Sequence, residues 1–156
     1  MEKKESYEEM PRVGIHICTF NRGPYLVGVL ASLYQQTYQN FDIVIVDDCS
    51  ETPVPNDPYV VQWIMFLRNN KKKITLVRNP VRLGVCKSRN IAVKSDERND
   101  IFIRLDDDSY CEPDYVERLV KLYVEKKKEG ENVGAVGGIV PYPAYPKIYR
   151  NSNRIK

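Results

Sequence analysis

The stretch IFIRLDDDSY, residues 101–110, places three aspartates directly after an apolar run that is typical of a buried strand. Adjacent carboxylates repel one another, and the repulsion grows as the surroundings become less polar. Residues Asp106, Asp107 and Asp108 therefore form either a solvated turn or a site on which a cation sits. The triplet alone does not decide between these alternatives, because such runs also occur in surface turns.

The rest of the chain alternates short β-branched runs with segments of helical spacing, which predicts an α/β fold with a mostly parallel sheet flanked by helices. Strands are expected at residues 13–18, 41–46, 73–77, 101–105 and 133–140. Helices are expected at about residues 26–33, 59–67, 84–95 and 113–125. The run 41–46 is nearly all apolar, as a strand covered on both faces would be.

Polar segments follow three of these strands at their carboxyl ends: CTFNR, DDCS and LDDDS. In an open parallel sheet, ligands bind beyond the carboxyl ends of the strands, where the winding reverses. The doubly wound order 3-2-1-4 makes the first and fourth strands neighbours. We therefore expect residues 19–22 to lie beside residues 106–108, which favours a ligand site over a bare turn.

Composition excludes several classes of function. The 156 residues carry a net charge of +3, too little to indicate nucleic acid, and no apolar run approaches the length of a membrane span. The four cysteines are not paired as C-x-x-C, so a zinc site is not expected. The first residues lack the apolar core of a signal peptide, so reduced thiols in a cytoplasmic setting are expected, with any contact to the inner face of a membrane made through other segments or partners. The single histidine, His16, lies within a strand and is expected to be structural.

The chemistry of the polar residues indicates a phosphate-bearing ligand. Mg²⁺ and Mn²⁺ prefer carboxylate oxygens and commonly bridge to phosphates, so a cation on the aspartate run would remove its repulsion. Asp48, on a second loop, could accept hydrogen bonds from a base or a ribose. Arg22, Lys87 and Arg89 could face phosphates.

Three ordered blocks of this chain resemble the family-2 type glycosyltransferases with the GT-A (Rossmann-like) fold. They are VGIHICTFNRGPYLVGVLASLYQQTYQNFDIVIVDDCS, NPVRLGVCKSRNIAV and IRLDDDSYCEPDYVERLV. The resemblance runs from about Val13 to Val140 and covers the N-terminal, nucleotide-sugar-binding portion of such enzymes. It implies a nucleotide-diphosphate sugar, with UDP favoured over GDP or dTDP, a divalent cation (Mn²⁺ or Mg²⁺), and inverting transfer to an acceptor that could be a saccharide, a lipid or a protein.

The resemblance also implies roles for individual residues. The nucleotide-binding positions are Thr19, Asn21, Arg22, Asp48, Lys87, Arg89, Asn90, Asp106 and Asp107. Asp106 and Asp108 match the ends of the family's D-x-D motif, which implies that they hold the metal. Asp107 is the variable middle position, and the choice between Asp107 and Asp108 as the direct metal ligand stays open.

The resemblance further implies three segments: a charged arm over residues 1–12, the nucleotide-sugar-binding domain over residues 13–140, and an irregular segment over residues 141–156. The acceptor part of such enzymes and their catalytic base are expected beyond Lys156, so the sequence assigns no catalytic residue. The chain would then be the donor-binding half of a longer enzyme, or a nucleotide-binding fragment without turnover.

Other enzyme classes fit the residues less well. A phosphatase of the haloacid dehalogenase type also uses D-x-D, but its nucleophile follows the first strand, whereas this run follows the fourth. A dinucleotide-binding protein needs G-x-G-x-x-G after the first strand, and CTFNRG lacks it. A sugar nucleotidyltransferase shares the type of sheet but has a glycine-rich first loop, which is also missing here.

Overall fold

The computed structural model describes residues 10–96 and 98–138. It divides the chain into two units, residues 1–116 and 117–156, and each is described by itself. Most of the predicted N-terminal arm and the whole of the predicted C-terminal segment lie outside the described residues, so these boundaries stay predictions.

The first unit is built on a four-stranded parallel sheet with the strand order β3-β2-β1-β4. Its strands are β1 (Val13–Thr19), β2 (Phe41–Asp47), β3 (Ile74–Arg78) and β4 (Ile101–Asp106). This confirms the predicted α/β class, the predicted order and the approximate bounds of four strands. Because β1 pairs with β2 on one side and β4 on the other, the ends of all three strands are brought to one edge.

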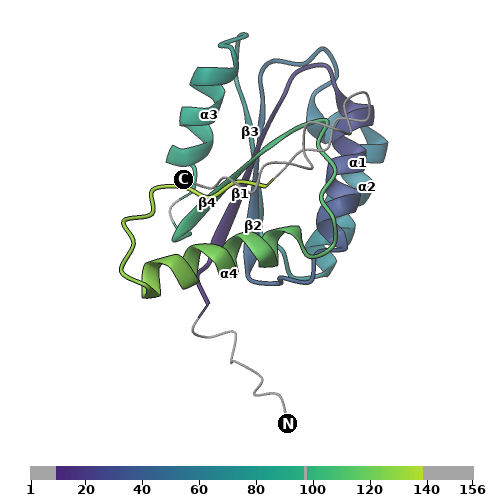
Figure 1. Ribbon diagram of the computed structural model, residues 1–156. Helices are drawn as coiled ribbons and strands as arrows, with labels where there is room; N and C mark the ends of the chain where they lie inside the picture. Colours follow the sequence, from purple (N-terminus) through teal and green to yellow (C-terminus); the bar gives the residue numbers. More distant parts are fainter. Residues whose placement is uncertain (1–9, 97, 139–156) are drawn as a thin grey trace, which may run out of the picture. The chain divides into compact units, whose positions relative to one another are not determined.

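Three helices cover the sheet in the first unit (Figure 1). Helices α1 (Gly23–Tyr34) and α2 (Pro58–Asn69) lie on one face, and α3 (Val85–Lys94) lies on the other. A short 3₁₀ turn, η2 (Val54–Asn56), precedes α2. The side chain of Asp57 caps α2 by accepting hydrogen bonds from the backbone N–H groups of Tyr59 and Val60.

The core follows from the alternation of side chains along each strand. Residues 41–46 are all buried, as the apolar run predicted, because helices cover both faces of this central strand, and Asp47, the last residue of β2, is buried as well. On the face of α3, Val44 and Val46 pack with Ala92, and Cys18 and Ile91 lie against them. Strand β4 alternates between buried and exposed residues, which suits its place at the edge of the sheet.

Helix α4 (Tyr115–Lys128) crosses the boundary between the two units. An ion pair of 2.8 Å joins Lys121 to Glu117 one turn earlier on its surface. Residues 131–138 form neither helix nor strand, so the strand predicted at 133–140 is wrong over residues 133–138, and residues 139–140 lie outside the described part. Two features explain the failed prediction. Glycines such as Gly134 and Gly137 weaken the interior of a strand, and an apolar run forms a strand only where a neighbouring strand is present to pair with it. In the described part of the chain, no helix combines the length and the apolar character that crossing a membrane requires.

Candidate functional site

Three loops meet at the carboxyl edge of the sheet, following β1, β2 and β4. Backbone hydrogen bonds join the first two loops and the segment after β3. The N–H of Asp48 donates to the carbonyl of Thr19 at 2.8 Å, and the N–H of Asn79 donates to the carbonyl of Asp47 at 2.9 Å. The polar side chains of this edge are therefore carried by segments that hold one another in place.

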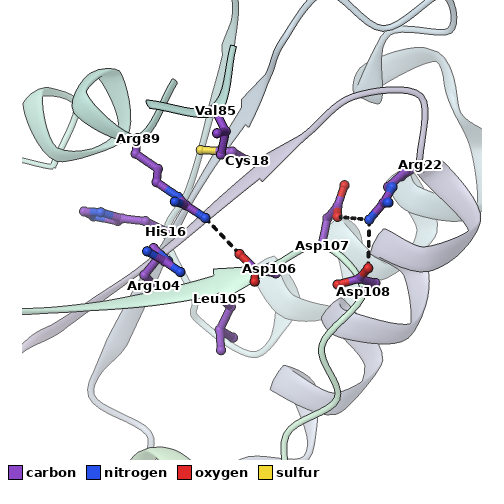
Figure 2. Close-up of a pocket in the computed structure, with 10 residues that line it drawn as sticks. All are labelled: His16, Cys18, Arg22, Val85, Arg89, Arg104, Leu105, Asp106, Asp107 and Asp108. Atoms are coloured by element: carbon purple, nitrogen blue, oxygen red, sulfur yellow. Dashed lines mark hydrogen bonds and ion pairs between the residues drawn. The ribbon is translucent and has the colours of Figure 1, made fainter. Parts of the chain in front are cut away.

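Each of the three consecutive aspartates pairs with an arginine (Figure 2). Nη1 of Arg22 donates to Asp108 at 2.7 Å and to Asp107 at 3.1 Å, and Nη2 of Arg89 donates to Asp106 at 3.1 Å. The hydrogen bond to Asp107 and the charges of both carboxylates raise the pKa of the Arg22 guanidinium. The repulsion within the run is thus relieved by cations from α3 and from the loop that leads into α1, and residues 19–22 do lie beside residues 106–108.

The three carboxylates differ in exposure. The side chain of Asp107 is only 9% exposed, whereas those of Asp106 and Asp108 are 56% and 47% exposed. The outer two aspartates of the run can therefore meet a ligand from solution, while the middle one is held inward. That the ends of the D-x-D motif hold the metal stays a prediction.

A cavity of about 240 Å³ opens at this edge and is lined by the three aspartates and their two arginine partners. His16, Cys18 and Arg104 also line it and were not predicted as site residues (Figure 2). The signal that could have found Arg104 is strand alternation, because it shares a face of β4 with Asp106. Burial raises the pKa of the Cys18 thiol to about 11, so this thiol is protonated at neutral pH.

His16 also forms a buried pair with Asp96, which follows α3. Its Nε2 lies 2.8 Å from the Asp96 carboxylate, and the imidazole stacks on Phe102 with ring centroids 5.0 Å apart. A Cβ at Gly14 would lie 1.8 Å from the same carboxylate, so glycine at this position makes room for the pair. These contacts support the structural role expected for His16.

Asp48 is buried and ties the segment between β3 and α3 to the end of β2. Its carboxylate accepts hydrogen bonds from Asn79 Nδ2 at 2.7 Å and from the backbone N–H groups of Leu83 and Gly84, both at 2.8 Å. Burial alone would raise the pKa of this carboxyl, but the hydrogen bonds outweigh burial and lower the pKa. This bracing role could not be predicted from sequence patterns, because two of the three donors belong to the backbone.

The loop after β1 is held by the loop after β2. Asn21 adopts a positive φ of 54°, which asparagine tolerates better than most residues. Its N–H donates to Ser50 Oγ at 2.9 Å, and its side-chain oxygen accepts from the N–H of Glu51 at 2.7 Å. Thr19 is buried, and among the described residues its Oγ1 finds no hydrogen-bond partner. Thr19 and Asn21 line a second cavity of about 280 Å³, which shares Arg22 with the first.

Helix α3 brings one of its three predicted residues to the aspartates. Its buried positions are Ser88 and Ala92, and Arg89 reaches Asp106 from the flank of that face. Lys87 and Asn90 are exposed and line neither of the two cavities described above. Their predicted contact with a nucleotide stays a prediction.

The donor set at the end of β4 suits a hard divalent cation in its chemistry, because carboxylate oxygens are the ligands that Mg²⁺ and Mn²⁺ prefer. Asp106 and Asp108 are the residues that could hold one. Across residues 10–96 and 98–138, however, no three His, Cys, Asp or Glu side chains converge as a ready metal site. The carboxylates are instead turned toward their arginine partners.

Comparison with known sequences relates the chain to glycosyltransferases. The family model described as glycosyl transferase family 2 matches residues 14–154. An uncharacterized glycosyltransferase of Haemophilus influenzae is 32% identical over 110 residues, which is 70% of this chain and 34% of that protein. The chain thus spans about a third of the length of this relative.

Comparison with solved structures relates the fold to the same class of enzymes. S. aureus TarS 1-349 in complex with UDP superposes with a TM-score of 0.60 at 20% identity, covering 83% of this chain and 38% of that one. The mannosyltransferase PcManGT from Pyrobaculum calidifontis, in complex with GDP-Man and Mn²⁺, superposes with a TM-score of 0.57 at 26% identity. That match covers 65% of this chain and 28% of the mannosyltransferase.

Proposed function

The chain belongs to glycosyl transferase family 2 and has the GT-A fold, and from this premise we propose that the carboxyl edge of its sheet binds a nucleotide-diphosphate sugar together with Mn²⁺ or Mg²⁺. The donor is UDP-linked, and the reaction is an inverting transfer of the sugar to an acceptor hydroxyl. The matched part of the chain corresponds to 34% of the length of the Haemophilus relative. Sugar transfer by a whole enzyme of that length is therefore included here as a proposal.

The observation that carries the proposal is the pairing of three carboxylates with two arginines around one cavity at the strand ends. Carboxylates are suited to a divalent cation, and guanidinium groups are suited to phosphate oxygens. Both kinds of group are needed where a diphosphate and its metal ion bind together. The UDP complex of TarS and the GDP-Man and Mn²⁺ complex of PcManGT support this choice of ligand.

The residues at the end of β4 and their partners would handle the diphosphate. Asp106 and Asp108 would hold the cation through their exposed carboxylates. A bound Mn²⁺ or Mg²⁺ supplies Lewis-acid stabilisation of the charge that develops on the leaving diphosphate. Arg22 and Arg89 would add hydrogen bonds to the same phosphate oxygens, and these bonds strengthen as that charge grows.

The nucleoside would lie toward the ends of β1 and β2. Asp48 would accept hydrogen bonds from the base or the ribose, on a carboxylate that already fixes the neighbouring segment. Thr19 and Asn21 border this region from the first loop, and Asp107 lies behind the two outer aspartates. Lys87 and Asn90 would approach the nucleotide from the exposed side of α3.

The acceptor side of the reaction requires a catalytic base. An inverting transfer needs a base within hydrogen-bond reach of the acceptor hydroxyl, so that the proton leaves as the new bond forms. None of the described residues is assigned to this role. The acceptor is a saccharide, a lipid or a protein.

The proposal is tested by calorimetric titration of UDP in the presence of Mn²⁺, and again with the metal chelated. We expect chelation to weaken binding at least tenfold, and Asp108→Ala to reproduce most of that loss with the metal present. Glu51→Gln is the matched control, because it removes one exposed carboxylate of the second cavity and should leave the metal effect intact. Equal affinity for UDP with and without metal would overturn the proposed cation site. The same titration with GDP and dTDP ranks the donor nucleotides.

A further inference from the structure

The aspartate run is already neutralised in large part by the protein itself. Nη1 of Arg22 lies 2.7 Å from the Asp108 carboxylate and 3.1 Å from that of Asp107, and Nη2 of Arg89 lies 3.1 Å from that of Asp106. Each of the three carboxylates thus already has one oxygen bound to a guanidinium group. Within the described residues no group of three potential ligands converges on a common point.

The two arginines draw the outer carboxylates apart. Figure 2 shows Asp106 turned toward Arg89 on one side of the cavity and Asp108 turned toward Arg22 on the other. A small divalent cation needs its oxygen ligands to converge at about 2 Å around one point. Each guanidinium engages one oxygen of its carboxylate, so a metal ion held by Asp106 and Asp108 together must compete with the arginines and turn both carboxylates toward one point.

We propose that Arg22 and Arg89 are intramolecular competitors of the divalent cation and exchange the aspartates for the phosphates of the donor when metal and nucleotide bind together. This inference rests on the proposed function, both for the cation at Asp106 and Asp108 and for the nucleotide. The geometry suits an exchange, because Arg22 is 49% exposed and Arg89 is 32% exposed, so both side chains can move without opening the core. Arginine binds carboxylate and phosphate with the same fork of N–H donors, so either partner satisfies it.

The exchange links metal binding to nucleotide binding. Metal alone must displace Arg89 from Asp106 and Arg22 from Asp108, which leaves Arg89 without its carboxylate and Arg22 with Asp107 only, so metal alone binds weakly. With a diphosphate present, the displaced arginines gain new partners, so each ligand raises the affinity for the other by the same factor. The aspartate run then remains charge-compensated whether the site is empty or filled.

The test is a Mn²⁺ titration followed by electron paramagnetic resonance, in ~0.15 M salt to screen long-range effects of charge. The first arm contains no nucleotide and compares the unmodified chain with Arg22→Gln and Arg89→Gln. We expect each variant to bind Mn²⁺ about two- to fivefold more tightly, the range that exposed ion pairs are worth. Arg82→Gln is the charge-matched control, because the Arg82 guanidinium lies 4.2 Å over the ring of Phe20, and its effect should be smaller. Circular dichroism establishes that each variant folds, and two separate arginines keep the test decisive if one variant does not.

A second arm repeats the titration with saturating UDP. UDP should raise the affinity of the unmodified chain for Mn²⁺ by a larger factor than it raises that of Arg22→Gln. Arginine variants that bind Mn²⁺ no more tightly than Arg82→Gln would overturn the competition. If UDP does not bind to the unmodified chain under any condition, the proposed function fails, but the first arm still decides whether the arginines compete with the metal.

Discussion

Replacing Asp48 by asparagine should destabilise the first unit far more than the loss of one charge from the surface would. The Asp48 carboxylate accepts three hydrogen bonds, from Asn79, Leu83 and Gly84, at 2.7 to 2.8 Å. In Asp48→Asn an NH₂ group replaces one acceptor oxygen and faces a backbone N–H, while the remaining bonds lose their charge assistance. Hydrogen bonds to charged groups are worth roughly 1.5–3 kcal/mol each, so we expect a loss of about 3 kcal/mol at pH 7.

The loss of stability caused by Asp48→Asn should be smaller at low pH than at neutral pH. The pKa of Asp48 is lowered in the folded chain. Its contribution to the free energy of unfolding is therefore fully present above the ordinary aspartate pKa of about 3.9, and it disappears as the pH falls through the lowered pKa of the folded chain. The gap between the unmodified chain and Asp48→Asn should therefore be constant near neutral pH and narrow below about pH 4. This dependence separates the charged hydrogen bonds from a simple effect of side-chain shape.

The assay is unfolding in urea, followed by the fluorescence of Trp63, the single tryptophan of the chain. Trp63 reports on the first unit, because its ring packs 6.0 Å from that of Tyr34 on α1. Asp100→Asn is the control, since Asp100 is exposed and accepts a hydrogen bond from the backbone N–H of Arg12 at 3.0 Å. A stability of Asp48→Asn within ~0.5 kcal/mol of the unmodified chain, or a gap that persists unchanged to pH 3, would refute the bracing role of Asp48.

Two further predictions concern the face of the sheet under α3. Gly14→Ala should lower the free energy of unfolding by about 3 kcal/mol in thermal denaturation, because the new Cβ would lie 1.8 Å from the Asp96 carboxylate. Gly134→Ala is the control and should change the stability little, because nothing lies within 4 Å of a Cβ there. Equal effects of the two substitutions would contradict the packing described. At pH 8, alkylation followed by mass spectrometry should label the exposed thiol of Cys86 quickly and that of Cys18 slowly, because burial raises the pKa of Cys18 to about 11. Rapid labelling of Cys18 would show that solvent reaches this thiol.

The sequence predicted most of the fold because local patterns and winding rules agree. Apolar runs identified four strands, and the doubly wound order placed the loop after β1 beside the end of β4. The expected strand at residues 133–140 failed over its described part, since composition cannot say whether a neighbouring strand exists to complete the hydrogen bonds. The burial of residues 41–46 could be predicted, because helices on both faces of a sheet require an apolar central strand, whereas the burial of Asp47 could not.

The site was predicted in part. The sequence identified the aspartate run and expected Arg22 and Arg89 to face phosphates, but it did not show that these arginines pair with the aspartates themselves. That contact depends on side-chain reach across three segments, which spacing along the chain does not encode. Arg104 was missed because a single charged residue within a strand carries no motif, although its place two residues before Asp106 puts it on the same face.

The central claim is that a divalent cation and a nucleotide diphosphate bind together at the end of β4. The most direct measurement is an anomalous difference map at the manganese edge, from crystals of the chain grown with UDP and Mn²⁺. We predict one strong manganese peak within coordination distance of the Asp108 carboxylate, with diphosphate oxygens completing its shell and the Arg22 guanidinium moved from Asp108 to a phosphate. Bound UDP with no manganese at Asp106 or Asp108, or manganese at another place on the chain, would contradict the claim.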